Sequence, residues 1–210
     1  MNFTHTEDRR MLADTLFRYV AEQYGIEARH KITRSPEGYS SAQWQQFAEL
    51  GAIGALFGEA EGGYGGAGFD IAVVFEALGR GLVVEPLLGA VLAGSAIAQA
   101  GNATQRAHLE QIIDGSTIAA FAHGEPGGYT LDQVATTATQ TADGWQLDGT
   151  KAMVQQGEAA TLFVVSARTA NGLSLFLVPA ATHGLSVRGS ATVDGGRVAQ
   201  VTLANATVPA

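Results

Sequence analysis

Apolar side chains in the first half of the chain recur at every third or fourth position, which is the spacing of one face of an α-helix. This spacing predicts helices over residues 5–24, 41–55, 70–82, 85–101 and 102–115. In the first of them the stripe runs through Met11, Leu12, Thr15, Leu16, Tyr19 and Val20. Residues typical of helix ends flank the segments: Ser40 or Ser41, Asp70 and Asn102 or Thr104 at starts, Pro86 in a first turn, and Gly101 and Gly115 just past ends.

After Gly115 the pattern changes to short runs rich in Val, Thr and Leu that are separated by turn residues. These runs predict strands within residues 117–124, 133–142, 145–154, 160–169, 173–180, 184–189 and 197–210. Asp143-Gly144 and Asn171-Gly172 each stand between two runs and indicate hairpins. The patterns predict an α+β protein, with an N-terminal all-α helical domain over residues 1–116 and an antiparallel β-barrel or β-sandwich domain over residues 117–210.

Composition narrows the classes of function. The chain has 210 residues, of which 46% are hydrophobic and 15% are charged, a globular composition with enough length for a sizeable core. The net charge of −8 argues against nucleic acid and against an anionic membrane surface as the main partner. The sequence has no cysteine, so disulfides, thiolate catalysis and cysteine metal sites are excluded.

The N-terminal stretch lacks the basic segment followed by an apolar core that is typical of a secretory signal. The most apolar run, Pro86 to Ala98, is about thirteen residues long, which is too short to cross a bilayer. From these two observations we expect a cytoplasmic protein without membrane insertion.

Residues 61–70, EGGYGGAGFD, contain the spacing G-x-G-x-x-G from Gly63 to Gly68. Glu85 follows at roughly the distance of the ribose-binding acid in dinucleotide sites. That fingerprint requires a preceding strand and a parallel sheet, whereas a predicted helix precedes these glycines and no βα units follow. We therefore interpret the stretch as a tight connection between helices, with glycines where the backbone passes close to another segment.

Several charged residues permit more than one interpretation. Glu59, Glu61 and Asp70 flank the glycines as a possible cation site, but flexible glycines without a neighbouring histidine favour a solvated loop. Lys151 is interpreted as a simple surface charge at a hairpin. Three arginines lie in different predicted strands, and whether they meet at a ligand phosphate is left open: Arg168, Arg188 and Arg197.

Several motifs follow one another in a fixed order: residues 50–82 with the glycine-rich stretch, then Glu125-Pro126-Gly127, Asp148-Gly149-Thr150-Lys151 and Val208-Pro209. This set resembles the acyl-CoA dehydrogenase family over essentially the whole chain, as its N-terminal helical domain followed by its middle β domain. More narrowly, the chain is similar to the small subunits of pimeloyl-CoA-type and steroid-side-chain dehydrogenases, which pair with a different large subunit.

The resemblance implies a reaction, a cofactor and partners. In that family a base removes the α proton of an acyl-CoA thioester while N5 of FAD accepts the β hydride, which gives a trans-2-enoyl-CoA. The resemblance also implies a homo- or hetero-oligomer of dehydrogenase subunits, with electron-transfer flavoprotein as the redox partner.

The resemblance implies flavin contacts on two segments. In the first, Phe121 matches the aromatic residue of the family, and Gly124 replaces a threonine whose hydroxyl can bond the flavin ring. His123 is unexpected there, and it is either a satisfied structural histidine or an imidazole that contacts or tunes the isoalloxazine.

The second segment is Met153-Val154-Gln155, where relatives carry Trp-Ile-Thr or a similar triplet. Met153 can pack on a ring, and Gln155 can donate hydrogen bonds. Tyr129 and Thr130 occupy the place where relatives have a serine near the substrate, so the resemblance implies that these two residues contact the substrate.

The catalytic glutamate of the family lies in a C-terminal helical domain that would follow Ala210. No catalytic residue and no metal ligand is therefore assigned in this chain, and Glu76, Glu85 and Glu125 are left open as alternative bases. We expect the surfaces that would pack on that domain to be apolar and exposed.

Three functions remain. The chain is the N-terminal portion of an FAD-dependent acyl-CoA dehydrogenase, inactive alone because its base is missing. Alternatively, it is a non-catalytic partner subunit that shapes the acyl channel of a flavin-bearing sister chain. The third alternative is a relative that uses the same scaffold for other flavin chemistry, such as monooxygenation.

Overall fold

The computed structural model of the protein describes residues 4–209. Residues 1–3, which begin the predicted helical domain and the stretch assessed for a secretory signal, lie outside the described part, as does Ala210. The helices are α1 Glu7–Gln23, α2 Ile26–Thr33, α3 Ser41–Glu49, α4 Gly68–Gly81, α5 Leu87–Ala100, α6 Ala103–Arg106 and α7 His108–Ile113, with short 3₁₀ turns at Gly54–Leu56, Glu59–Glu61 and Leu131–Gln133. The strands are β1 Ala119–Ala122, β2 Thr137–Thr141, β3 Gly144–Gln155, β4 Leu162–Thr169, β5 Gly172–Pro179, β6 Leu185–Ala191 and β7 Arg197–Val208.

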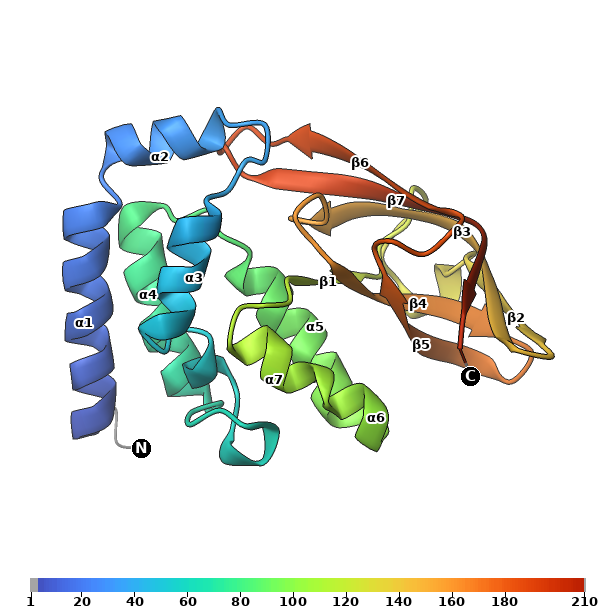
Figure 1. The fold of residues 1–210 in the computed structure, drawn as a ribbon, viewed down its shortest axis with the longest axis horizontal. Helices are drawn as coiled ribbons and strands as arrows, with labels where there is room; N and C mark the ends of the chain where they lie inside the picture. Colours follow the sequence, from blue (N-terminus) through green and yellow to red (C-terminus); the bar gives the residue numbers. More distant parts are fainter. Residues whose placement is uncertain (1–3, 210) are drawn as a thin grey trace.

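The α+β class is confirmed, with helices gathered at one end of the molecule and a strongly curled sheet at the other (Figure 1). The chain changes from helix to strand between Ile113 and Ala119, on either side of the predicted boundary at residue 116. No helix in residues 4–209 combines the length and the apolarity that a membrane crossing requires.

Most predicted helix ends are correct. Ser40 caps α3 by accepting a hydrogen bond from the backbone N–H of Gln43, and Asn102 caps α6 in the same way from Gln105. Pro86 directly precedes α5, and Gly101 follows its last residue. The segment predicted as one helix over residues 102–115 is divided into α6 and α7.

The sequence predicts that Asp70 caps α4 from just outside the helix. In the structure Asp70 lies within the first turn of α4 instead. The helix begins at Gly68, and the Asp70 carboxylate accepts a hydrogen bond from the N–H of Ala67 at 3.0 Å. The same carboxylate is 2.5 Å from Nε of Arg9 on α1, so it joins two helices as well as stabilising a helix start. Asp70 is therefore an ion-paired helix residue, which corrects its interpretation as part of a solvated loop.

The glycine-rich stretch is a close-packed connection between α3 and α4, as the sequence predicts. Gly63, Gly65 and Gly66 donate their backbone N–H groups to carbonyls of Gly58, Phe57 and Ala55. A Cβ on Gly63 or Gly65 would collide with the same 55–58 backbone segment. These N–H groups therefore already donate to carbonyl oxygens of the protein. A pyrophosphate could bind them only by replacing those carbonyl acceptors.

The sheet runs in the order β1-β4-β2-β3-β7-β6, with β5 paired to β4. Both predicted hairpins are confirmed, since Thr141 pairs with Gly144 and Thr169 with Gly172. The sheet is mixed, which corrects the expectation of a purely antiparallel domain, because β1 and β2 run parallel to β4. Both strands run in the direction of β4 beside opposite ends of it, β1 along residues 162–165 and β2 at Arg168.

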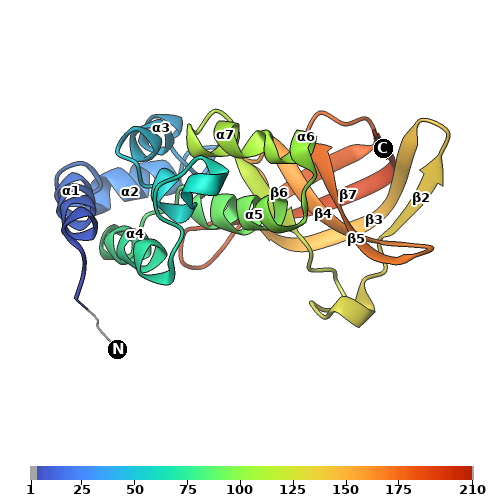
Figure 2. The same ribbon diagram turned by 90° about the horizontal axis from the view of Figure 1, so that it is seen from below.

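Helix α5 lies between helices α1 to α4 and the sheet, against β1, with α6 and α7 beside it (Figures 1 and 2). Its buried side joins an apolar cluster that continues from the helices to Ile118, Ala119, Leu162 and Val164 of the β region. A second cluster fills the inside of the curled sheet. The outer side of α5 exposes Leu88 and Leu92, one helical turn apart.

Candidate functional site

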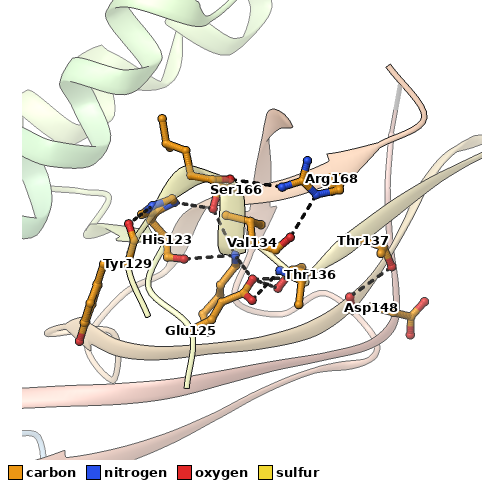
Figure 3. A network of polar contacts seen from close by, with 12 residues as sticks. His123, Glu125, Tyr129, Val134, Thr136, Thr137, Asp148, Ser166 and Arg168 are labelled. Atoms are coloured by element: carbon orange, nitrogen blue, oxygen red, sulfur yellow. Dashed lines mark hydrogen bonds and ion pairs between the residues drawn. The ribbon is translucent and has the colours of Figure 1, made fainter. Parts of the chain in front are cut away.

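A buried ion pair forms the centre of a polar network below β1. Lys151 of β3 is 0% exposed, and its Nζ lies 2.7 Å from Oε1 of Glu125, whose side chain is 8% exposed (Figure 3). The ammonium also donates to the carbonyl of His123 at 3.3 Å and to Oγ of Ser166 at 3.1 Å. All three N–H groups of Lys151 are thus used. The interpretation of Lys151 as a surface charge is therefore wrong.

Glu125 is held as a carboxylate by several donors. Burial alone would raise its pKa, but Lys151, the hydroxyl and N–H of Thr136 and the N–H of Ala135 all donate to it, and together they lower the pKa to about 2. Burial lowers the pKa of Lys151, and the neighbouring Glu125 opposes that effect. Pairing is the condition under which two such charges are tolerated inside a protein.

The network extends from Ser166 to His123 with defined donor and acceptor roles. Ser166 Oγ accepts from Lys151, so its own hydrogen is directed to Nδ1 of His123 at 2.9 Å. Nε2 of His123 is 2.9 Å from the carbonyl of Tyr129, which can only accept. These partners assign the imidazole proton to Nε2. Both nitrogens are engaged, as expected for a structural histidine, and a contact with flavin stays a prediction.

The side chains of His123, Glu125 and Arg168 hold the loop that follows Glu125. His123 binds the carbonyl of Tyr129, while Arg168 of β4 donates to the carbonyls of Leu131, Asp132 and Val134 (Figure 3). At the end of the loop, the carboxylate of Glu125 accepts hydrogen bonds from the backbone N–H groups of Ala135 and Thr136. The exposed side chains of this loop are therefore carried on a fixed backbone.

A serine beside a histidine and a lysine also suggests nucleophilic acyl transfer. Ser166 is only 1% exposed, however, and its hydroxyl is fixed between Lys151 and His123. A nucleophile must reach a carbonyl carbon, which Ser166 cannot do from inside the sheet. The arrangement is therefore structural.

The two segments for which flavin contacts are predicted lie side by side. The N–H of Ala152 donates to the carbonyl of Gly124 at 2.8 Å, which joins the end of β1 to β3. Phe121 and His123 are two positions apart, with ring centroids at 6.1 Å and planes inclined by 24°. The sequence alone did not reveal this adjacency of residues 121–124 and 151–155.

Residues of the second segment point in different directions. Met153 has a left-handed backbone, φ 54°, and its side chain is 51% exposed, whereas Val154 is buried in the sheet core. Any contact of Val154 with a ligand would therefore involve its backbone. Gln155 is exposed and lines a cavity of about 560 Å³ between α4, α5 and β3.

Tyr129 occupies the space that a side chain at position 124 would need. A Cβ on Gly124 would lie 2.6 Å from Cδ1 of the Tyr129 ring. The tyrosine is nevertheless 61% exposed, and Thr130 beside it is exposed as well. Substrate contacts by these two residues stay predictions.

The remaining candidates are dispersed. Glu76 is exposed and pairs with Arg80, and Glu85 is buried at the junction of α4 and α5. Glu125 is a weak base because of its low pKa and its ion pair. The three arginines have separate partners: the carbonyls near Val134 for Arg168, Gln200 for Arg188 and Glu158 for Arg197.

Comparisons with known proteins agree with this arrangement of helices and sheet. Residues 6–116 match the acyl-CoA dehydrogenase N-terminal domain, and residues 120–205 match the acyl-CoA dehydrogenase middle domain. The chain belongs to the acyl-CoA dehydrogenase family. Among curated relatives, Acyl-CoA dehydrogenase FadE27 of Mycobacterium tuberculosis is 30% identical over all of this chain and 56% of its own length.

Two solved acyl-CoA dehydrogenase structures show the same architecture. The ChsE4-ChsE5 complex from Mycobacterium tuberculosis superposes with a TM-score of 0.88 at 27% identity, over 100% of this chain and 57% of the other. A variant of the Tcur3481-Tcur3483 steroid ACAD superposes with a TM-score of 0.86 at 30% identity, over 95% of this chain and 55% of the other. The chain thus spans about half the length of the relatives that it matches.

The residues fit one face of the FAD that this dehydrogenase family binds. Phe121 and Met153 offer partly exposed apolar surface for a ring, and the exposed amide of Gln155 can donate to ring heteroatoms. His123 contributes no spare ring nitrogen, since both are engaged within the protein. The set offers apolar surface for a flat ring and few side-chain donors.

Sequence reasoning missed the polar network around Lys151 and Glu125. Ser166 and Thr136 lie in ordinary strand patterns, and nothing in their neighbours marks them. The position of Lys151 could have been predicted. Alternate residues of a strand face the same side, and Lys151 is four positions after the buried Leu147, so it faces inward. An inward lysine requires an acid, and Glu125 is that acid.

Proposed function

We propose that this chain forms the N-terminal and middle portions of an FAD-dependent acyl-CoA dehydrogenase that converts an acyl-CoA thioester into the trans-2-enoyl-CoA. The catalytic base comes from outside the described residues. When bound, FAD accepts the hydride from the β carbon.

The observation that carries the proposal is the junction of β1 and β3. The hydrogen bond from Ala152 to Gly124 brings the segment of Phe121 beside the segment of Met153 and Gln155, and Gln155 also lines the cavity between the helices and the sheet. A ring on these segments would have an apolar space beside it, which is what an acyl chain needs. Family membership supports the chemistry.

The roles of the chain's own residues follow from their contacts. Phe121 and Met153 exclude water from one side of the ring, and Gln155 orients it by hydrogen bonding. Lys151 and Glu125 keep β1 and β3 in register below, so that these side chains are held in place before a ligand arrives. Tyr129 and Thr130, on the fixed loop, contact the substrate at the edge of the site.

Several exposed apolar side chains support the proposal that another part of the protein, or a partner chain, packs on this region. Leu88 and Leu92 of α5 are 42% and 45% exposed, and Leu131 and Met153 are 66% and 51% exposed. Soluble domains seldom leave several large apolar side chains uncovered without a partner. We assign this surface to the helical part that completes a dehydrogenase, from the same polypeptide or from a sister chain.

A flavin titration tests the proposal. Purified chain, alone and with any co-purifying sister chain, is titrated with FAD and then with acyl-CoA under anaerobic conditions. Binding is expected to shift the flavin absorbance, and acyl-CoA is expected to bleach it when the base is present. Flavin that neither binds nor bleaches in the purified complex contradicts the proposal.

A partner subunit without its own flavin is the second candidate. The observation that favours it is the Tyr129 ring, which occupies the space beside Gly124 within the predicted flavin surface. Intact mass distinguishes the two. A 21.7 kDa chain that co-purifies with a larger, yellow sister chain, and binds no FAD itself, indicates the partner role.

A further inference from the structure

Strand β5 forms an unpaired edge of the curled sheet. It pairs with β4 over its whole length, from Gly172 to Pro179, without a register shift. Within residues 4–209, β4 is the only strand paired with β5, which lies along the lower margin of the sheet in Figure 1. The backbone groups on the outer side of β5 are therefore available to a further strand.

The hydrogen bonds to β4 identify these outer backbone groups. Just past the end of β5, the N–H of Ala180 donates to the carbonyl of Thr161 at 2.9 Å. In an antiparallel ladder, every second residue directs both its N–H and its C=O toward the partner strand. Counting back by twos from Ala180, the N–H and C=O groups of Leu173, Leu175 and Leu177 point away from β4.

The side chains of the same three leucines lie on one face of the sheet. Leu173 and Leu175 are 38% and 36% exposed. Leu175 and Leu177 line a cavity of about 490 Å³, whose opposite wall includes Gln105 of α6 and His108 of α7. The edge therefore has free backbone groups and, beside them, a cavity with room for further apolar side chains.

This edge lacks the features that usually prevent strands from pairing. Residues 172–179, GLSLFLVP, include no charged side chain, and proline occurs only at the last position. Edge strands of soluble proteins normally carry a charge, a bulge or a proline that blocks a further strand. The opposite edge, β6, has Arg188 at its centre and is protected in this way.

The pattern of β5 is complementary to itself. A two-fold axis at Leu175 places this residue opposite Leu175 of a second copy, and it places Leu173 opposite Leu177. Each outward N–H and C=O group of the three leucines then has a partner, and the leucines of both copies lie on one face. The chain has a net charge of −8, so two copies repel one another, but the uncharged β5 strands bring no like charges into contact.

We propose that two copies of this chain associate through β5, which pairs antiparallel with β5 of the second copy to form one continuous sheet. Only residues of β5 and the neighbouring cavity carry this proposal, so it is independent of the proposed dehydrogenase function.

The first test is the molecular mass of the 210-residue chain in solution, measured by analytical ultracentrifugation from about 1 µM to about 100 µM. The mass is expected to rise with concentration from 21.7 kDa toward twice that value. Leu175→Lys puts two like charges opposite each other at the axis, so this variant is expected to keep the mass of a single chain. Val187→Lys, on the opposite edge at 37% exposure, is the matched control and should associate like the unmodified chain.

Cross-linking tests the register of the pairing. The sequence has no cysteine, so one introduced cysteine reports on one position. The thiols of Leu175→Cys lie opposite each other across the axis, and a short bismaleimide is expected to join them. The thiols of Leu173→Cys lie about 14 Å apart, and those of Val187→Cys lie outside the interface, so both variants are expected to give about tenfold less dimer.

Three results overturn the proposal: a single-chain mass at every concentration, a dimer that survives Leu175→Lys, or equal cross-linking at positions 173, 175 and 187. Circular dichroism verifies that Leu175→Lys is folded, and if it is not, the cross-linking pattern decides. A chain that stays single but joins a sister chain through β5 would contradict self-association and assign this strand to a heteromeric interface.

Discussion

Lys151 Nζ lies 2.7 Å from Glu125 Oε1 inside the sheet region, and this contact ties β3 to the segment that follows β1. The pair connects Ser166, Thr136 and His123 into one network. Lys151 and Glu125 can exchange these hydrogen bonds for contacts with water only if the strands separate. The predicted ligand surface above it therefore depends on a buried charge pair.

Removing the ammonium should be costly. Lys151→Met leaves the Glu125 carboxylate buried without its cation, and we expect the free energy of unfolding to fall by about 3–5 kcal/mol. Chemical denaturation measures it, with Lys31→Met on exposed α2 as a control that should change stability by less than about 0.5 kcal/mol. Adding Glu125→Leu to Lys151→Met should cost less than the sum of the single changes. Simple additivity would contradict the coupling.

Stability should decrease in acid because of Glu125. The folded pKa is about 2, against an ordinary value of 4.5. The carboxylate therefore contributes its full stabilisation above about pH 4.5, and that contribution, on the order of 3 kcal/mol, is lost as the pH falls toward 2. Denaturation at a series of pH values checks this. Glu125→Gln should be less stable at pH 7 yet show a shallower acid slope, and an unchanged slope would contradict the assignment.

The glycine-rich connection should not tolerate a single methyl group. A Cβ on Gly65 would lie 3.0 Å from the carbonyl carbon of Ala55 and closer still to its oxygen. We expect Gly65→Ala to destabilise the protein by about 1–3 kcal/mol, as measured by denaturant unfolding. Gly68→Ala, three residues on, meets nothing within 4 Å and begins a helix, so it should be neutral or stabilising. Equal effects would show that the packing is not responsible.

Gly124 and Tyr129 should be energetically coupled. The Cβ of Gly124→Ala would displace the Tyr129 ring, at a cost of about 1 kcal/mol that should shrink when Tyr129→Ala is also present. A double-mutant cycle measures the coupling, and Gly127→Ala, with open space around it, is the control. If Tyr129 blocks a flavin site, Tyr129→Ala should also strengthen FAD binding. No coupling between the two positions would show that the ring moves freely.

Local patterns predicted the elements because each depends on a few neighbouring residues. The helix ends at Ser40 and Gly101 and the hairpins at Gly144 and Gly172 follow from capping and turn chemistry within four positions. The same reasoning failed at Asp70, because its ion-pair partner Arg9 is 61 positions away in the sequence, on the neighbouring helix α1.

The sequence could indicate which residues belong to the candidate site, but not how they are arranged in space. Family motifs pointed to Phe121 and Met153, whereas the adjacency of their strands is set by hydrogen bonds across 28 or more positions, such as Ala152 to Gly124. Exposed apolar surface was expected wherever a further domain would pack. Leu88 and Leu92 of α5 are exposed, and the packing of a domain on them stays a prediction. Ser166 was not foreseeable, since only the folded sheet brings it to Lys151 and His123.

The apolar cluster that begins among the helices does not stop at residue 116. Leu16 and Phe47 share it with Ala119 and Val164, and Arg29 of α2 bonds the carbonyl of Asp194 in the β6–β7 turn. The change from helix to strand at this point therefore lies within one continuous apolar cluster. A fragment that ends at residue 116 would leave the helical side of this cluster without the side chains of β1 and β4 that pack on it. We therefore expect such a fragment to be less stable than the chain of residues 4–209.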